Sequence, residues 1–180
     1  YGALQTQNFT TATDNYNVGI GYNAGGATTT GTLNTAVGGL ALNTNTTASN
    51  NTAVGYNSLY ANTTGQANTA VGSLALDANT TGDYNVALGY YALGAATTAD
   101  KNVAIGSGAA QSITTGTQNV AVGADALDAN TTGNQNTAVG YDALGSNTTA
   151  SWNTAVGREA LKSVTTGTYN TGVGRTAGML

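Results

Sequence analysis

Cysteine, histidine and proline are absent from the 180 residues, and methionine, tryptophan and phenylalanine occur once each. Without cysteine the chain has no disulfide framework, no thiolate nucleophile and no cysteine-based metal site. Without histidine it lacks the commonest general base and metal ligand. The four basic and eight acidic side chains leave a net charge of −4, which argues against binding to nucleic acids or anionic membranes. No apolar run approaches the ~20 residues of a membrane-spanning helix. These absences predict a chain that is not an enzyme, uses no cofactor or metal ion and does not insert into a membrane.

What the chain does contain is a repeat of constant length. Each repeat contains an asparagine at a constant spacing, and we number this asparagine position 0. Position 3 is then always aliphatic and position 4 is always glycine. Position 7 is alanine except at Ser58, and position 8 is mostly leucine. Positions 12 and 13 are Thr-Thr in all nine complete repeats, so the consensus is N-T-A-V-G-x-x-A-L-x-x-N-T-T-G-x-x. The asparagine recurs every 17 residues without insertion or deletion, at Asn17, Asn34, Asn51, Asn68, Asn85, Asn102, Asn119, Asn136, Asn153 and Asn170.

A strict short period indicates stacked structural units that contact only their neighbours. Seventeen residues are too few for a helical repeat, which needs roughly 30–45. The N-T-A-V-G and x-x-A-L-x segments are short, partly β-branched and bounded by glycine or N-T-T-G, as strands and turns are. We therefore predict an all-β parallel β-solenoid of about ten coils, with one 17-residue coil per repeat and two short strands and a longer turn in each coil. Coils stacked ~4.8 Å apart would form a rod on the order of 50 Å long.

The same numbering predicts the organisation of the ends. Residues 1–16 are expected to form a partial coil with an enlarged turn, because twelve residues instead of eight separate Leu4, at position 8, from Asn17. Residues 17–180 are expected to form the solenoid of ten repeats, the last of them truncated. At least one open sheet edge must then be paired or covered, by a longer chain or by end-to-end stacking.

Several repeat positions predict specific roles. Glycine at position 4 is expected where the chain turns, with positive φ or with neighbouring backbone close by. The position-0 asparagines can form an amide ladder between coils, although asparagine is also a common turn residue. One threonine of each Thr-Thr pair is expected to point inward or bond the backbone, and the other to face water.

Positions 2–3 and 7–8 are pairs of adjacent apolar residues, which departs from the alternation of a strand with one solvent-facing side. We expect the larger residue, valine or leucine, to fill the solenoid interior. Alanine would then line a second face, either against a partner chain in a symmetric assembly such as a trimer or against solvent.

The segment Asn102-Val103-Ala104-Ile105-Gly106-Ser107-Gly108-Ala109 resembles the head repeats of trimeric autotransporter adhesins, whose heads are left-handed parallel β-rolls. The longer repeat, as in Asn136 to Gly140 with Ala143-Leu144 and Asn147-Thr148-Thr149, is similar to repeat arrays of phage tail-fibre-like and bacterial surface proteins. The resemblance covers essentially the whole chain. It implies an extracellular fibre at a cell surface or on a virion.

Side chains that could bind a ligand fall in columns. Asp125, Asp142 and Glu159 share position 6 of consecutive coils, where Ca²⁺ could relieve their repulsion, although a solvated acidic strip offset by Arg158 and Arg175 is the simpler interpretation. Aromatic rings at positions 5 and 16 could stack on sugars, pack at corners or lie in a subunit interface; they are Tyr22, Tyr56, Tyr90 and Tyr141, and Tyr16, Tyr84, Trp152 and Tyr169. Sequons that could carry glycans, or simply form turns, begin at Asn8, Asn45, Asn50, Asn62, Asn79, Asn130 and Asn147.

Our leading functional hypothesis is an extracellular, non-enzymatic structural fibre or adhesin shaft whose partner is the chain itself, in a trimeric rod or an end-to-end filament. A second hypothesis is an ice-binding solenoid that uses the threonine ladders, although these lie in a turn and not in a T-x-T strand. A third is a carbohydrate-binding surface module that binds host or environmental glycans through the tyrosine columns.

Overall fold

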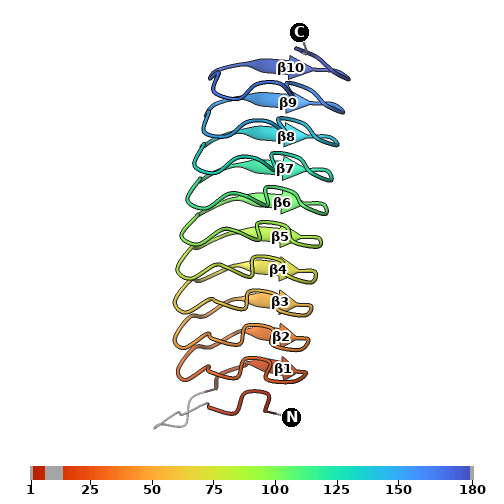
Figure 1. Ribbon diagram of the computed structural model, residues 1–180. Helices are drawn as coiled ribbons and strands as arrows, with labels where there is room; N and C mark the ends of the chain where they lie inside the picture. Colours follow the sequence, from red (N-terminus) through yellow and green to blue (C-terminus); the bar gives the residue numbers. More distant parts are fainter. Residues whose placement is uncertain (1, 7–13, 179–180) are drawn as a thin grey trace.

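The computed structural model describes residues 2–6 and 14–178, and none of these residues is helical. One three-residue strand occurs in each repeat, and the strands form a single ten-stranded parallel sheet in chain order (Figure 1). The strands are β1 (Val18–Ile20), β2 (Thr35–Val37), β3 (Thr52–Val54), β4 (Thr69–Val71), β5 (Val86–Leu88), β6 (Val103–Ile105), β7 (Val120–Val122), β8 (Thr137–Val139), β9 (Thr154–Val156) and β10 (Thr171–Val173). The predicted parallel β-solenoid with one 17-residue coil per repeat is confirmed.

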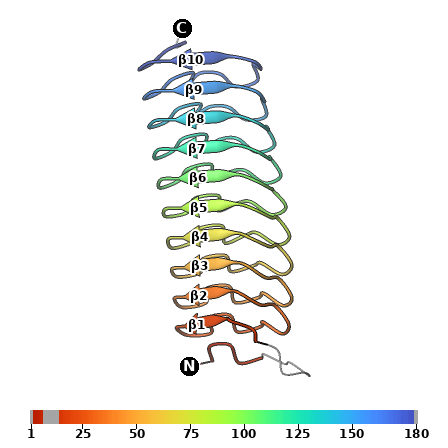
Figure 2. The same cartoon turned by 180° about the vertical axis from the view of Figure 1, so that it is seen from behind.

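The register between strands repeats the sequence period without a slip. Thr52 of β3 pairs with Thr69 of β4, and Ala53 and Val54 pair with the residues 17 positions later. The same pairing relates the other neighbouring strands, and the view from behind shows the coils stacked in one column (Figure 2). Because every residue lies over its equivalent in the next coil, each repeat position forms a row parallel to the solenoid axis.

Each coil contains one strand and not the two that the sequence predicted. The second apolar segment, around positions 6–8, forms turns in the structure. Leu40 at position 6 and Leu42 at position 8 have φ values of 60° and 52°. A strand requires extended backbone with negative φ, so this alternation of left-handed residues prevents a second strand from forming.

The orientation predicted for the strand residues is also wrong. In β3 it is Ala53 that is fully buried, whereas Val54 is only half-buried and lies on the outer face. The leucine at position 8, such as Leu59, is fully buried as predicted, together with the alanine or serine before it. Leucine therefore occupies the larger part of the narrow interior, and the strand can contribute only a methyl group to it.

Glycine at position 4 combines both of the expected properties. Gly55 has a φ of 134°, and a Cβ atom placed on it would lie 2.6 Å from the carbonyl oxygen of Gly72 in the next coil. A side chain at this position would therefore clash with backbone as well as strain φ. This explains why no repeat has any other residue here.

The N-terminal segment covers part of the first coil. The backbone N–H of Leu4 donates to the carbonyl of Ala24 (2.9 Å), and the Leu4 side chain lies against Gly19 and Gly25. At the other end Leu161 lies in the same way against Gly172 and Gly178. These glycines leave room for the leucine of the preceding coil. Most of the predicted enlarged turn lies outside the described residues.

Candidate functional surfaces

The position-0 asparagines connect neighbouring coils through their side-chain amides. Asn51 is fully buried, and its Oδ1 accepts the backbone N–H of Asn68 in the next coil (2.9 Å). Its Nδ2 donates to the carbonyl of Gly65 at the end of its own coil (2.9 Å). The same Oδ1 contact joins every successive pair of these asparagines from Asn17 to Asn170. Each amide therefore closes its own coil and holds the next one, which is a structural role.

A second buried asparagine row occupies position 11, and the sequence did not identify it as structural. The Nδ2 of Asn62 donates to the Oδ1 of Asn45 in the preceding coil (3.1 Å) and to the carbonyl of Gly65 (2.9 Å). The row is interrupted by Ala96 and Ile113, and the Oδ1 of Asn79 beside this gap has no hydrogen-bond partner. The signal that could have found this row was the 17-residue recurrence of these asparagines, which the sequence analysis explained by glycosylation or by turn formation.

Burial of this second row bears directly on the predicted glycosylation sites. The side chains of Asn45, Asn62, Asn79, Asn130 and Asn147 are fully buried, so a glycan at any of them is incompatible with the folded solenoid. Asn50 is exposed, with a φ of 64°, and glycosylation there stays a prediction. Asn8 lies outside the described residues.

The two threonines of each Thr-Thr pair differ in their environment. The hydroxyl of Thr63, at position 12, donates to the carbonyl of Thr80 in the next coil (3.0 Å). Thr64, at position 13, is exposed. The first threonine thus contributes to coil stacking, and the second forms an exposed row on the turn, as expected.

The outer face consists of strand positions 1 and 3 together with positions 16 and 5, which lie just before and just after each strand. In the coil of β5 these are Tyr84, Val86, Leu88 and Tyr90. Position 1 is threonine or valine, and position 3 is valine, isoleucine or leucine in every coil. Several of these side chains are exposed, with Ile20 at 60% and Leu88 at 45%. The sheet therefore presents an apolar strip to solvent, with an unbroken aliphatic row at position 3 beside a mixed row of threonine and valine at position 1, and positions 5 and 16 border this strip.

The predicted aromatic columns form these two borders. All eight rings are between 47% and 72% exposed. Trp152 and Tyr169 on one border stack face to face, with ring centroids 5.0 Å apart and an interplanar angle of 1°. On the other border the guanidinium of Arg158 lies over the ring of Tyr141, 5.6 Å from its centroid. The rings are therefore partly exposed, and several of them also contact neighbouring side chains.

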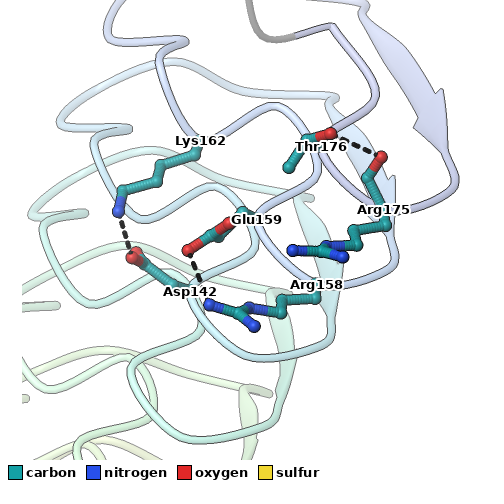
Figure 3. Close-up of polar contacts among 6 residues, drawn as sticks. All are labelled: Asp142, Arg158, Glu159, Lys162, Arg175 and Thr176. Atoms are coloured by element: carbon teal, nitrogen blue, oxygen red, sulfur yellow. Dashed lines mark hydrogen bonds and ion pairs between the residues drawn. The ribbon is translucent and has the colours of Figure 1, made fainter.

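Two members of the predicted acidic column, Asp142 and Glu159, are paired with basic side chains near the C-terminal end of the solenoid (Figure 3). Lys162 donates to Asp142 (Nζ to Oδ2, 2.6 Å), and Arg158 contacts Glu159 more loosely (3.4 Å). The hydrogen bond and the charge of Asp142 raise the pKa of Lys162 above its usual value. Among the described residues, no group of three or more carboxylates is placed to hold a metal ion. Lys162, which the sequence analysis did not single out, takes the place of the proposed cation beside Asp142.

Two other carboxyl groups, both at position 9, have perturbed titration. Burial raises the pKa of Asp77 above the ordinary aspartate value. Burial also raises the pKa of Asp128, and the negative charges of Asp142 and Asp125 add to that effect. One oxygen of each group, Oδ1, is buried without a hydrogen-bond partner, so ionisation is poorly compensated at both positions.

Comparisons with known proteins found no matching family model, curated protein or solved structure. Within residues 2–6 and 14–178 there is also no helix that is long and apolar enough to cross a membrane.

Proposed function

We propose that this chain is an extracellular, non-enzymatic structural fibre or adhesin shaft that self-associates side by side into a rod. The observation that carries the proposal is the exposed apolar strip on a solenoid whose ten strands keep one register throughout. A continuous exposed apolar surface favours a protein contact, because burying it removes apolar area from water.

The size of the outer face supports association between copies of the chain. Ten strands ~4.8 Å apart and four outward rows give a face of at most about 900 Å², because rows ~6.6 Å apart are the fully extended limit and position 16 is not extended. A stable interface buries about 800 Å² on each partner. The face is therefore large enough for one specific contact, and valine and threonine rows of equal spacing on two copies can pack along their whole length.

The internal contacts support a mechanical role. The asparagine ladders, the Thr hydroxyl contacts and the alanine–leucine core connect each coil only to its neighbours, and none of them needs a disulfide or a metal ion. Such a structure resists bending and local opening because each coil is held by backbone and side-chain hydrogen bonds on both sides. A rod that holds a terminal domain away from a surface requires this property.

Sedimentation velocity and electron microscopy test the proposal. The wild-type chain is expected to sediment as a dimer or larger assembly, and Val54→Lys with Val71→Lys is expected to convert it to monomers because two charges enter the apolar strip. Thr64→Lys with Thr81→Lys is the matched control, since both threonines are exposed on the turn away from the strip. A wild-type chain that stays monomeric at every concentration would overturn the proposal.

A further inference from the structure

One border of the outer face carries an evenly spaced series of rings. Tyr22, Tyr56 and Tyr90 occupy position 5 in the first, third and fifth coils, and we call them the tyrosine row. Their exposed fractions are 59%, 57% and 59%, so all three rings are presented to solvent to the same extent. Two coil spacings separate each ring from the next, which is ~9.6 Å along the axis.

The coils between these tyrosines carry small residues at the same position. Gly39 lies between Tyr22 and Tyr56, and Ser73 lies between Tyr56 and Tyr90. A Cβ atom placed on Gly39 would lie 3.6 Å from Cδ2 of Tyr56, so the Tyr56 ring extends over the glycine and uses that space. Each ring of the row is thus separated from the next by a coil with a small uncharged residue at position 5, and the Tyr90 ring also lies beside the Tyr91 ring, with centroids 6.3 Å apart.

The chemistry of the row favours a neutral sugar chain. The outward positions of the first five coils contain no charged side chain. Exposed aromatic faces bind the apolar face of a hexopyranose, while the phenol hydroxyl can bond a sugar hydroxyl. In an extended β-1,4-linked polysaccharide every sugar is turned over relative to the one before it. The same sugar face therefore recurs at every second residue, at nearly the interval that separates these tyrosines.

We propose that the tyrosine row is a binding site for a single extended β-1,4-linked polysaccharide chain that lies along the solenoid axis and stacks alternate sugars on Tyr22, Tyr56 and Tyr90. The site uses one border of the outer face, and the proposal goes beyond the rod: it is made for the free chain, because an assembly that packs all four outward rows together would cover the same rings. Cellulose-type and chitin-type chains share the required geometry.

Calorimetric titration with soluble hexasaccharides tests this site. The probes are β-1,4-linked glucose and β-1,4-linked N-acetylglucosamine hexamers, and the α-1,4-linked glucose hexamer is the control because it does not extend in this way. The protein is expected to bind at least one β-1,4-linked hexamer and not the α-linked one. A preference for the glucose hexamer indicates a cellulose-type chain, and a preference for the N-acetylglucosamine hexamer indicates a chitin-type chain. Failure to bind either β-1,4-linked hexamer overturns the proposal.

Substitutions in the tyrosine row test whether sugar binding depends on the spacing of the rings or only on their number. Tyr56→Ala is expected to weaken binding by about tenfold, whereas Tyr60→Ala, at position 9 outside the row, should leave it unchanged. The decisive variant exchanges two residues, Tyr56→Ser with Ser73→Tyr, which keeps the composition but places the rings three coils and one coil apart. It should bind as weakly as Tyr56→Ala. Equal binding by the exchanged and wild-type proteins overturns the proposal.

A contact between copies of the chain is the alternative use of these rings. If Tyr56→Ala dissociates an assembly in sedimentation velocity and the wild type binds no β-1,4-linked hexamer, the row belongs to a protein interface and the polysaccharide proposal is wrong. If hexamer binding is present in a chain shown to be monomeric, the polysaccharide site stands and the rod proposal fails.

Discussion

Single asparagine side chains give this solenoid much of its specificity. An amide can accept and donate at once, and the buried asparagines use both functions, one toward the next coil and one toward the end of their own coil. An aspartate could not donate, and an aliphatic residue could do neither. A residue whose two hydrogen-bonding groups have different fixed partners is constrained more strongly than one that only fills space.

Replacing one of these amides should be costly. In Asn68→Ala the backbone N–H of Asn85 loses its acceptor, whereas the carbonyl of Gly82 keeps a bond from Asn79. One buried unsatisfied donor together with the cavity should lower stability by about 2 kcal/mol. Asn50→Gln is the control, because Asn50 is exposed and glutamine is found at this position in other coils, and it should change stability by less than about 0.5 kcal/mol. Equal denaturation midpoints for the two variants would contradict the ladder's role.

A second residue-scale prediction concerns pH. Burial and the nearby charges of Asp142 and Asp125 raise the pKa of Asp128 in the folded chain above its unfolded value. The folded state is therefore destabilised as pH rises through the unfolded pKa, and the full penalty is present above the folded pKa. Asp128→Asn removes this penalty, so it should raise the denaturation midpoint near pH 7. The gain should vanish below about pH 3, where the carboxyl is neutral in both states. A gain that is the same at both pH values would contradict this explanation.

At the scale of the single element, the strand shows where sequence reasoning succeeded and where it failed. The strict 17-residue recurrence predicted the coil, the register and the glycine turn, because each of these depends on spacing alone. The recurrence did not reveal which side of the strand faces inward, since alanine and valine are both apolar. That choice depends on the volume already filled by a leucine such as Leu59, which lies six residues after Ala53 and packs in the same interior.

The prediction of a second strand was wrong, and the second asparagine row was missed, for a related reason that lies in the turns. Left-handed backbone at leucine, as at Leu42 and Leu59, is unusual for a residue with a Cβ atom and is not indicated by the sequence. It is imposed by stacking on identical neighbours. The aromatic columns, in contrast, were placed correctly beside the strand, because their positions follow from the repeat numbering.

The reversed orientation of the strand can be tested with two substitutions of adjacent residues. Ala70→Val adds two methyl groups to a fully buried site and should lower stability by about 1–3 kcal/mol. Val71→Ala removes a half-buried outer side chain and should cost less than about 1 kcal/mol. Guanidinium denaturation followed by circular dichroism measures both. If Val71→Ala were the more damaging change in a monomeric chain, valine and not alanine would face the core.

At the scale of the whole molecule, the chain is a one-dimensional stack. Each strand contacts only the strands before and after it, and the asparagine, threonine and backbone contacts also join adjacent coils. Stability in such a stack is close to a sum of coil terms and nearest-neighbour terms. Whole coils can therefore be added to or removed from this fold, whereas the 17-residue register between neighbouring coils must be kept.

Removing one complete coil tests this description of the molecule. Deletion of residues 102–118 brings Asn119 to the place of Asn102, where its N–H can bond the Oδ1 of Asn85, and it leaves the tyrosine row intact. The shortened chain should fold, keep nearly the same denaturation midpoint, and lose ~4.8 Å of its longest dimension in small-angle X-ray scattering. Deletion of residues 102–110 removes about half a coil, so alanine, leucine and asparagine rows no longer align and the chain should not form a cooperative solenoid. If both deletions behaved alike, the stability of the molecule would not arise from stacked equivalent coils, and the rows on which the rod and the polysaccharide site depend would have no structural basis.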